Sequence, residues 1–287
     1  MSDAPRPPRL WTSALAFAVY LATVLIGTVV TLALFLLARA QPGRVDEALT
    51  QEAVAALGTS LPGILLAGLV SSLAGVGVAL AAASLSPQPV LARLRLVPTR
   101  RGSLVALAAT LAMVGMGALS SAVTRMLHFE NRGTLPLIRE ALRGLTPPQM
   151  ALGVAIIGVS AGVGEELFFR GYLLTRLAAR WRPWVGNAVV AALFALMHLD
   201  PVHSSFALLV GLALGWTSLR AKSVLPTLGA HVLNNTMSVV STSVESGEDD
   251  APLRVLFVAG PVAIAAGLYA VARLTRGTVR GDEHLPT

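Results

Sequence analysis

The chain has 287 residues, of which 54% are hydrophobic and only 13% charged, and its mean hydropathy is +0.70, far outside ordinary soluble usage. This excludes a soluble globular protein, and the absence of cysteine excludes disulfides, a cysteine nucleophile and cysteine-ligated metals. The net charge of +7 comes from basic residues that flank apolar segments. We interpret them as topology signals that face anionic lipid, and we expect no nucleic-acid partner.

Eight uncharged windows are candidate membrane helices, since about 20 apolar residues are needed to cross the hydrocarbon core. In chain order they are 10–38, 53–92, 102–124, 144–164, 183–199, 201–219, 223–244 and 255–272. Proline residues shorten the second window to one helix of ordinary length. The first ends in Ala38-Arg39-Ala40, which imitates a signal-peptide cleavage site, but its apolar run is too long for one. We therefore expect an uncleaved first helix.

The predicted fold class is all-α: a polytopic membrane bundle of about eight transmembrane helices. We expect one integral-membrane domain over 10–273, with short cytoplasmic tails at 1–9 and 274–287. Glycines four residues apart predict places where helices approach closely. They are the pairs Gly158/Gly162 and Gly211/Gly215.

Basic residues predict the orientation in the membrane. With eight spans, 15 Lys and Arg residues fall on the side of the termini and 7 on the other side. Because Lys and Arg are enriched on the cytoplasmic side of membranes, we expect a protein of the plasma membrane with both termini in the cytoplasm.

Few ionisable side chains lie at membrane depth, where each is costly and so suggests a function. Glu165, Glu166 and Arg170 continue the fourth window, His198 lies near the end of the fifth, and His231 lies inside the seventh. Glu166 and Arg170 are four residues apart on one helix face and can form an ion pair. Glu165 is rotated by about 100° and has no such partner in its helix, so it is the better candidate for a reactive carboxylate.

Polar and aromatic neighbours extend this constellation. Asn235 lies four residues after His231 and could donate its amide to a developing oxyanion, with Asn234 as a geometrical rival. Phe194 precedes His198 by one turn and could wall a cavity and fix the imidazole. A buried carboxylate beside two histidines suits general-base activation of water.

Three motifs follow one another on consecutive hydrophobic segments. They are EExxxR in Glu165-Glu166-Leu167-Phe168-Phe169-Arg170, FxxxH in Phe194-Ala195-Leu196-Met197-His198, and HxxxN in His231-Val232-Leu233-Asn234-Asn235. In this order they resemble the CPBP (Abi-like) family of intramembrane proteases, which includes type II CAAX prenyl endopeptidases and bacteriocin-processing or self-immunity proteins. The resemblance covers about residues 150–240.

The resemblance implies a hydrolase that cleaves a peptide bond within a membrane cavity. It assigns the activation of water to Glu165, assistance to His198, and stabilisation of the carbonyl and oxyanion to His231 and Asn235. Glu166, Arg170 and Phe194 are then supporting residues. The partners implied are the lipid bilayer and a membrane-associated protein or peptide substrate, either CAAX-prenylated, a bacteriocin precursor or another membrane polypeptide.

A divalent metal such as zinc is an open alternative. Glu165, His198 and His231 would be its ligands, since two histidines and one glutamate with an open position suit catalytic zinc. We favour a metal-free site because Glu165 cannot be a ligand and a free base at the same time.

Two other functions use the same region. Gly158-Val159-Ser160-Ala161-Gly162 spells the G-x-S-x-G pattern and allows a serine hydrolase based on Ser160, although that motif needs a strand-to-helix turn. Buried Glu and His residues could also relay protons in a proton-coupled transporter, but no inverted repeat is visible.

A compact set of polar residues follows the fifth window. His198, Asp200 and His203 resemble metal ligands, but Pro201 breaks a helix between them. We therefore interpret Asp200 and His203 as solvated residues of a short loop.

Depth along the helices predicts where the site opens. At about 1.5 Å per residue, Glu165, His198 and His231 average in the cytoplasmic half of the membrane. Their depths agree only if the helices tilt or the fourth helix continues past Arg170. We expect a water-filled cavity that opens to the cytoplasm.

The topology can be tested with single cysteines, because the chain contains none of its own. A cysteine at position 5 or 282 should react with a membrane-impermeant maleimide only after the cells are permeabilised. Labelling of either position in intact cells would overturn the predicted orientation.

Overall fold

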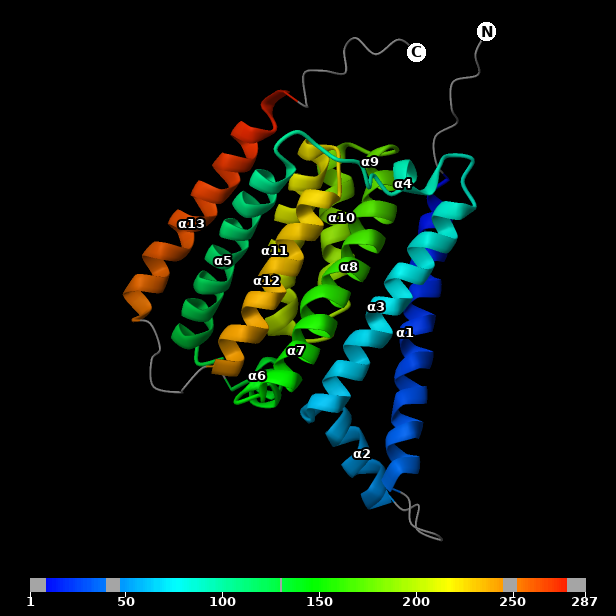
Figure 1. Cartoon of the computed structure of the whole chain (residues 1–287), viewed down its shortest axis with the longest axis vertical. Coiled ribbons are helices and arrows are strands. Elements are labelled where there is room, and N and C mark those ends of the chain that lie inside the picture. Colours follow the sequence, from blue (N-terminus) through cyan, green and yellow to red (C-terminus); the bar gives the residue numbers. More distant parts are fainter. Residues whose placement is uncertain (1–8, 40–46, 130, 245–251, 278–287) are drawn as a thin grey trace.

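The computed structural model describes residues 9–39, 47–129, 131–244 and 252–277, so the predicted tails lie mostly outside it. Every regular element in these ranges is a helix, and the long helices form one bundle (Figure 1). The all-α prediction is confirmed.

Each predicted window corresponds to a helix of the bundle. The helices are α1 (Leu10–Arg39), α3 (Leu61–Ser84), α5 (Gly102–Met126), a composite fourth helix over 147–178, α10 (Pro183–Leu196), α11 (Pro201–Ala221), α12 (Leu225–Val244) and α13 (Leu253–Leu274). In the described part of the chain, six are long and apolar enough to cross a membrane. The exceptions are α10, which has 14 residues, and α12, which carries polar side chains. The count of eight spans therefore stays a prediction.

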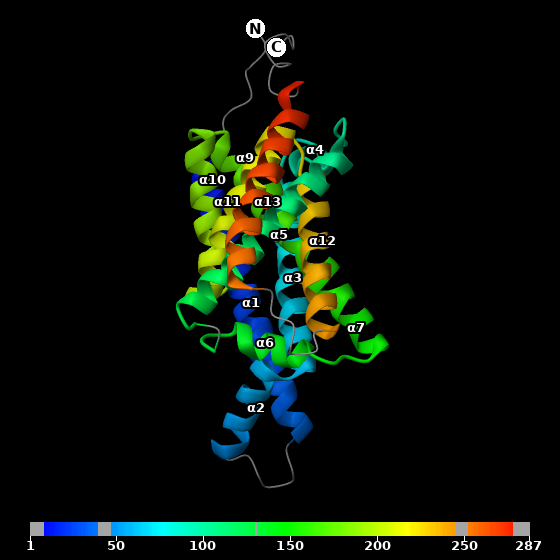
Figure 2. The same cartoon turned by 90° about the vertical axis from the view of Figure 1, so that its left-hand side faces the viewer.

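Short helices connect the long ones at the two ends of the bundle. They are α2 (Glu47–Thr59), α4 (Val90–Arg93) and α6 (Leu135–Leu142). The start of α1 and the end of α13 lie at the end that carries α4, whereas α2 and α6 lie at the other end (Figures 1 and 2). We call the former the basic end, because its described residues include Arg9, Arg93, Arg95, Arg100, Arg101, Arg176, Arg180, Arg182, Arg220, Lys222 and Arg273.

The fourth helix is continuous but changes its winding. It consists of α7 (Pro147–Gly153), η1 (Val154–Ala161), α8 (Gly162–Glu165), η2 (Glu166–Leu174) and α9 (Thr175–Ala178). The η segments are π-helical, a wider winding with i→i+5 hydrogen bonds that is often found at functional sites. The helix continues well past Arg170, which is one of the two ways expected to reconcile the depths of the site residues.

Glycines let neighbouring helices touch the fourth helix. A Cβ atom at Gly162 would lie 3.0 Å from Val232 Cγ2 on α12, and one at Gly164 would lie 2.6 Å from the Ser72 carbonyl oxygen on α3. Gly211 similarly admits Ala191 of α10. These contacts confirm the predicted close packing, and they hold the fourth helix between α3 and α12.

Aromatic side chains from three helices form the centre of the core. Tyr20 of α1 lies 4.5 Å from Phe168 and 5.9 Å from Phe169, measured between ring centroids. Phe169 in turn lies 5.2 Å from Phe194 of α10, in an edge-to-face arrangement. Edge-to-face pairs add to the stabilisation from burial. The four rings thus form a continuous row of contacts across the core, from α1 to α10.

The turn between α10 and α11 corrects the sequence interpretation. Asp200 is only 3% exposed and caps α11, where it accepts the backbone N–H of His203 at 2.7 Å. It also accepts the N–H of Thr134, in the connection between α5 and α6, at 2.6 Å. Pro201 begins α11 and His203 lies in its first turn. Asp200 thus lies in the short connection, as expected, but the interpretation of it as solvated was wrong, and His203 belongs to α11 and not to a loop. The two N–H donors make the buried carboxylate tolerable.

Asp200 should stabilise the fold in a pH-dependent way. Burial by itself raises the pKa of Asp200, but the N–H donors of His203 and Thr134 hold the pKa below its ordinary value. The stabilisation is present above the pKa of the unfolded chain, about 3.9, and is lost as the pH falls through the lower pKa of the folded protein.

We expect Asp200→Asn to lower the free energy of unfolding at neutral pH by about 1–3 kcal/mol, because a charged acceptor of two N–H groups is lost. Unfolding in detergent micelles at a series of pH values would measure this. The difference from the wild type should shrink as the pH is lowered through the acid range. A difference that is constant with pH would contradict the role of the carboxylate charge.

Candidate active site

Two carboxylates from the fourth helix meet one imidazole from α12. His231 Nδ1 lies 3.0 Å from Glu166 Oε1, and His231 Nε2 lies 3.5 Å from Glu165 Oε2. An ionised carboxylate only accepts hydrogen bonds, so Nδ1 carries a proton toward Glu166. The second nitrogen is then directed at Glu165. The contact between Gly162 and Val232 produces this meeting, because it places α12 directly against α8.

The predicted ion pair of Glu166 and Arg170 is present. Arg170 Nη1 donates to Glu166 Oε1 at 2.7 Å, and both side chains are almost fully buried, at 1% and 0% exposed. Arg170 Nη2 lies 3.5 Å from the Gly211 carbonyl oxygen, and the guanidinium lies over the Phe194 ring at 4.5 Å. Glu166 is therefore paired with the charge of Arg170 and also accepts a hydrogen bond from His231.

Glu165 and Glu166 differ in their access to solvent. The Glu165 side chain is 20% exposed, whereas that of Glu166 is fully buried. A water molecule or a substrate can therefore reach Glu165, while Glu166 is committed to Arg170 and His231. This agrees with the expectation that the two neighbouring carboxylates serve different purposes.

His198 lies just after the end of α10 and is oriented by the backbone. Its Nδ1 is 3.0 Å from the Phe194 carbonyl oxygen, which can only accept, so in the neutral ring Nε2 carries the lone pair. The Phe194 ring lies edge-on to both histidines, with centroids 5.0 Å from His198 and 6.1 Å from His231. The His203 ring lies 4.3 Å from that of His198.

The two candidate asparagines are linked. Asn235 Nδ2 lies 3.4 Å from the Ile157 carbonyl oxygen of η1, and Asn234 Nδ2 lies 3.4 Å from Asn235 Oδ1. Asn235 thus directs its amide toward the π-helical part of the fourth helix, one turn beyond His231. This favours Asn235 over Asn234 as the amide beside the site.

The structure bears on the metal alternative through the spacing of the donor side chains. Among the described residues, no three His, Asp or Glu side chains form a group that could hold a metal ion. The Nδ1 atoms of His231 and His198 are engaged by Glu166 and by a backbone carbonyl, which leaves Nε2 of each ring as the available donor, as in metal-bound histidines. The metal-free site therefore stays a prediction, with zinc held by Glu165, His198 and His231 as the alternative.

Ser160 lies inside η1, within the continuous helix 147–178. The G-x-S-x-G motif needs a strained strand-to-helix turn to expose its serine. Such a turn is missing around Ser160, so the serine-hydrolase alternative lacks its geometrical requirement.

Sequence reasoning did not find two contacts of the site. The hydrogen bond from His231 to Glu166 joins residues 65 apart, and the tilted ring contact of His203 with His198 depends on the cap at Asp200. The i,i+4 rule connects residues on one helix only. The position of His231 within a predicted membrane helix was a signal that a buried partner existed.

Residues 147–237 match the family model described as type II CAAX prenyl endopeptidase Rce1-like. This segment of the chain is therefore similar to a family of CAAX-type intramembrane proteases. The matched segment contains all three motifs and every candidate residue described above. No curated protein and no solved structure matches the chain. The matched family consists of CAAX prenyl endopeptidases, which are hydrolases, and the described part of this chain has six helices long and apolar enough to cross a membrane.

A double-mutant cycle tests the buried network. Glu166→Gln should lower the free energy of unfolding by about 3–5 kcal/mol, because it leaves the Arg170 charge buried and unpaired. Arg170→Met should cost a similar amount, and the double variant should cost clearly less than the sum. Unfolding in detergent micelles would measure all three variants.

Gln51→Ala is a matched control, because Gln51 and Glu47 form an exposed i,i+4 hydrogen bond on α2 at 3.2 Å. It should change the free energy of unfolding by less than about 0.5 kcal/mol. Strict additivity of the Glu166 and Arg170 variants would show that the two charges do not stabilise one another.

Proposed function

We propose that the protein cleaves a peptide bond of a membrane-associated polypeptide, with water activated by Glu165. The observation that carries this proposal is the imidazole of His231 shared between two unequal carboxylates, buried Glu166 and accessible Glu165. An accessible carboxylate next to an oriented imidazole can take a proton from water and return it. The match of residues 147–237 to a CAAX prenyl endopeptidase family supports peptide hydrolysis as the reaction.

The proposed reaction begins with a water molecule between Glu165 and His198. Glu165 removes a proton while the water oxygen forms a bond to the scissile carbonyl carbon, and the lone pair on His198 Nε2 orients the water. The carbonyl oxygen becomes an oxyanion. The oxyanion re-forms the carbonyl as the C–N bond breaks and Glu165 delivers its proton to the amide nitrogen. This yields a carboxylic acid and an amine, and the acid proton then passes to the amine.

His231 and Asn235 are proposed to stabilise the oxyanion. Glu166 accepts from Nδ1 of His231 and fixes the orientation of the ring. The Nε2 edge of this ring and the Asn235 amide would then stabilise the oxyanion, a type of interaction worth about 10²–10³ in rate per donor. Arg170 takes no part in the chemistry and keeps Glu166 charged.

The substrate and the orientation are part of the proposal. We infer a polypeptide that reaches the site from the membrane, and the family description makes a prenylated C-terminal segment the first candidate, with a bacteriocin precursor or another membrane polypeptide as alternatives. We place the protein in the plasma membrane with the basic end in the cytoplasm, because the described Lys and Arg residues gather at that end. Entry of the substrate from the cytoplasmic side stays a prediction.

The proposed catalytic roles predict how much the rate of peptide cleavage falls in each of three variants. Glu165→Gln should lower the rate of peptide cleavage by at least about 100-fold, and His231→Ala by a similar factor, while Asn235→Ala should cost about 10²–10³-fold in kcat. Cleavage of a fluorescent farnesylated peptide by protein in liposomes would measure these rates. The unfolding temperature of each variant would show that it is folded.

Ser160→Ala serves as the control and should keep wild-type activity. If Ser160→Ala were inactive and Glu165→Gln active, a serine mechanism would replace the one proposed. Cleavage by neither the wild type nor the control would reject the farnesylated peptide as substrate. Trapping with Glu165→Gln, followed by mass spectrometry of the polypeptides bound to it but not to wild type, would then identify the substrate class.

A further inference from the structure

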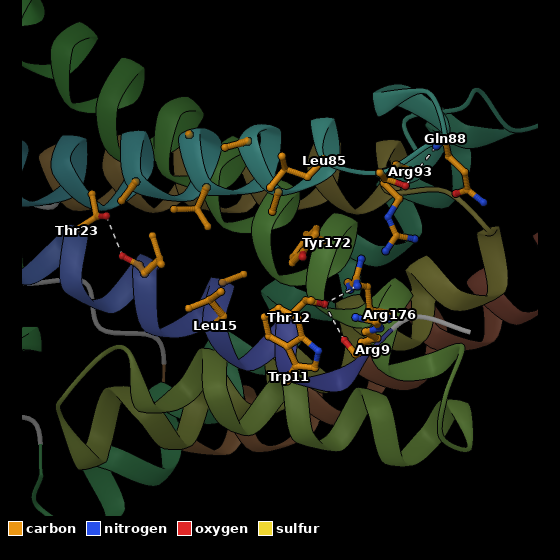
Figure 3. Close-up of a pocket in the computed structure, with 18 of the residues that line it drawn as sticks. Arg9, Trp11, Thr12, Leu15, Thr23, Leu85, Gln88, Arg93, Tyr172 and Arg176 are labelled. Carbon is orange, nitrogen blue, oxygen red and sulfur yellow. Dashed lines mark hydrogen bonds between the residues drawn. The ribbon is translucent and has the colours of Figure 1, made fainter. Parts of the chain in front are cut away.

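A large groove lies between α1 and α3 (Figure 3), and Glu165 and His231 are not among the described residues that line it. Its volume is about 1550 Å³, well above the 300–1000 Å³ or so that is usual for drug-sized ligands. The walls are apolar side chains of the two helices, among them Leu15, Val19 and Leu73. The groove follows α1 from the basic end as far as Gly27, which corresponds to about 25 Å along the helix.

Three arginines surround the basic end of the groove. Arg9 precedes α1, Arg93 ends α4, and Arg176 belongs to α9. Figure 3 shows the side chains of Arg93 and Arg176 pointing toward one another beside Tyr172. Among the described residues that line the groove, none is Asp or Glu. The head of the groove therefore concentrates positive charge.

The arginines lack counter-charges within the described chain. Arg176 donates from Nη2 to the Thr12 hydroxyl at 2.5 Å, and its guanidinium lies 5.2 Å from the Tyr172 ring centroid. The Nε atoms of Arg93 and Arg176 are both buried without a hydrogen-bond partner. Burial, and then the charge of Arg176, lower the pKa of Arg93. Unpaired buried donors are costly, and an anion with several acceptor oxygens would relieve this cost.

The lining of the groove also indicates how deep in the membrane a bound ligand would lie. Trp11 lies at its head and is 59% exposed, and tryptophan is enriched at the level of the lipid headgroups. A ligand with its anionic group at Arg93 and Arg176 would therefore extend its apolar part into the hydrocarbon layer. A soluble anion has no apolar part to fill the groove, and a zwitterionic lipid brings a cation close to the three arginines.

We propose that this groove binds an anionic phospholipid, with its phosphate between Arg93 and Arg176 and its acyl chains along α1 and α3. Guanidinium groups match phosphate oxygens in a bidentate manner, and basic pockets between membrane helices bind anionic headgroups in this way. The lipid packs against Ala16, Ala74 and Tyr172, which belong to the same core as Phe168. It completes the packing of α1 on the helices that carry the site.

The headgroup contact can be tested on the purified full-length protein. Binding of dioleoyl-phosphatidylglycerol, dioleoyl-phosphatidylcholine and inorganic phosphate would be compared by native mass spectrometry and by the unfolding temperature in a neutral detergent. We expect phosphatidylglycerol to bind at least about tenfold more tightly than phosphatidylcholine, and inorganic phosphate to have no effect. The combined variant Arg93→Gln, Arg176→Gln should lose this preference. The matched variant Arg180→Gln, Arg182→Gln, at exposed positions of the same end, should keep it.

A separate variant tests whether the acyl chains of the lipid lie in the groove. Gly77 lines the groove, and a Cβ atom there would meet nothing within 4 Å. Gly77→Leu therefore fills the groove without disturbing the fold, and it should weaken phosphatidylglycerol binding about tenfold or more. Gly117→Leu is the control, because Gly117 on α5 has equally open surroundings and lies outside the groove lining.

Three results would overturn the proposal. The first is equal binding of the two lipids, and the second is phosphatidylglycerol binding that survives both Gly77→Leu and the arginine variant. The third is competition in which a farnesylated peptide displaces phosphatidylglycerol and loses affinity with the same variants, since the groove would then be a substrate site. Lipid binding is measured without peptide cleavage, so this test is independent of the proposed proteolysis.

Discussion

A carboxylate with no exposed surface organises this protein. Glu166 holds Arg170 at 2.7 Å and His231 at 3.0 Å through one oxygen atom. An isolated charge at that position would be prohibitively costly in lipid, so the Arg170 guanidinium and the N–H of His231 are a condition for burying it. Because Arg170 comes from the same helix and His231 from α12, the interaction fixes one helix against the other.

The backbone around this network is shaped to allow it. Gly162 lets α12 approach closely enough for an imidazole to reach two consecutive carboxylates, and Gly164 does the same for α3 on the opposite side. The π-helical segments η1 and η2 flank α8, so that Glu165 is the last residue of α8 and Glu166 is the first residue of η2. Small residues and the π-helical winding therefore fix the relative positions of the side chains in the site, because they set how closely and at what rotation the helices pack.

Much of this arrangement could be predicted from the sequence, for physical reasons that differ by residue. The helices follow from uncharged windows, because lipid leaves the backbone few alternatives. The pair of Glu166 and Arg170 follows from helical spacing. The contact of His231 with Glu166 does not, because it depends on how α12 rotates against α8. Asp200 was misassigned because its partner, Thr134, lies 66 residues away, and a local pattern carries no information about such a partner.

The two histidines of the site are held from different ends of the bundle. His231 is in the second turn of α12, which starts at the basic end, while His198 belongs to the turn that Asp200 fastens to the connection leading into α6. Membrane helices adjust their tilt to the thickness of the hydrocarbon layer. A thinner or thicker bilayer would shift these two anchor points relative to each other, and with them the distance between the imidazoles. The thickness of the bilayer would thus set the distance between the imidazoles of His198 and His231.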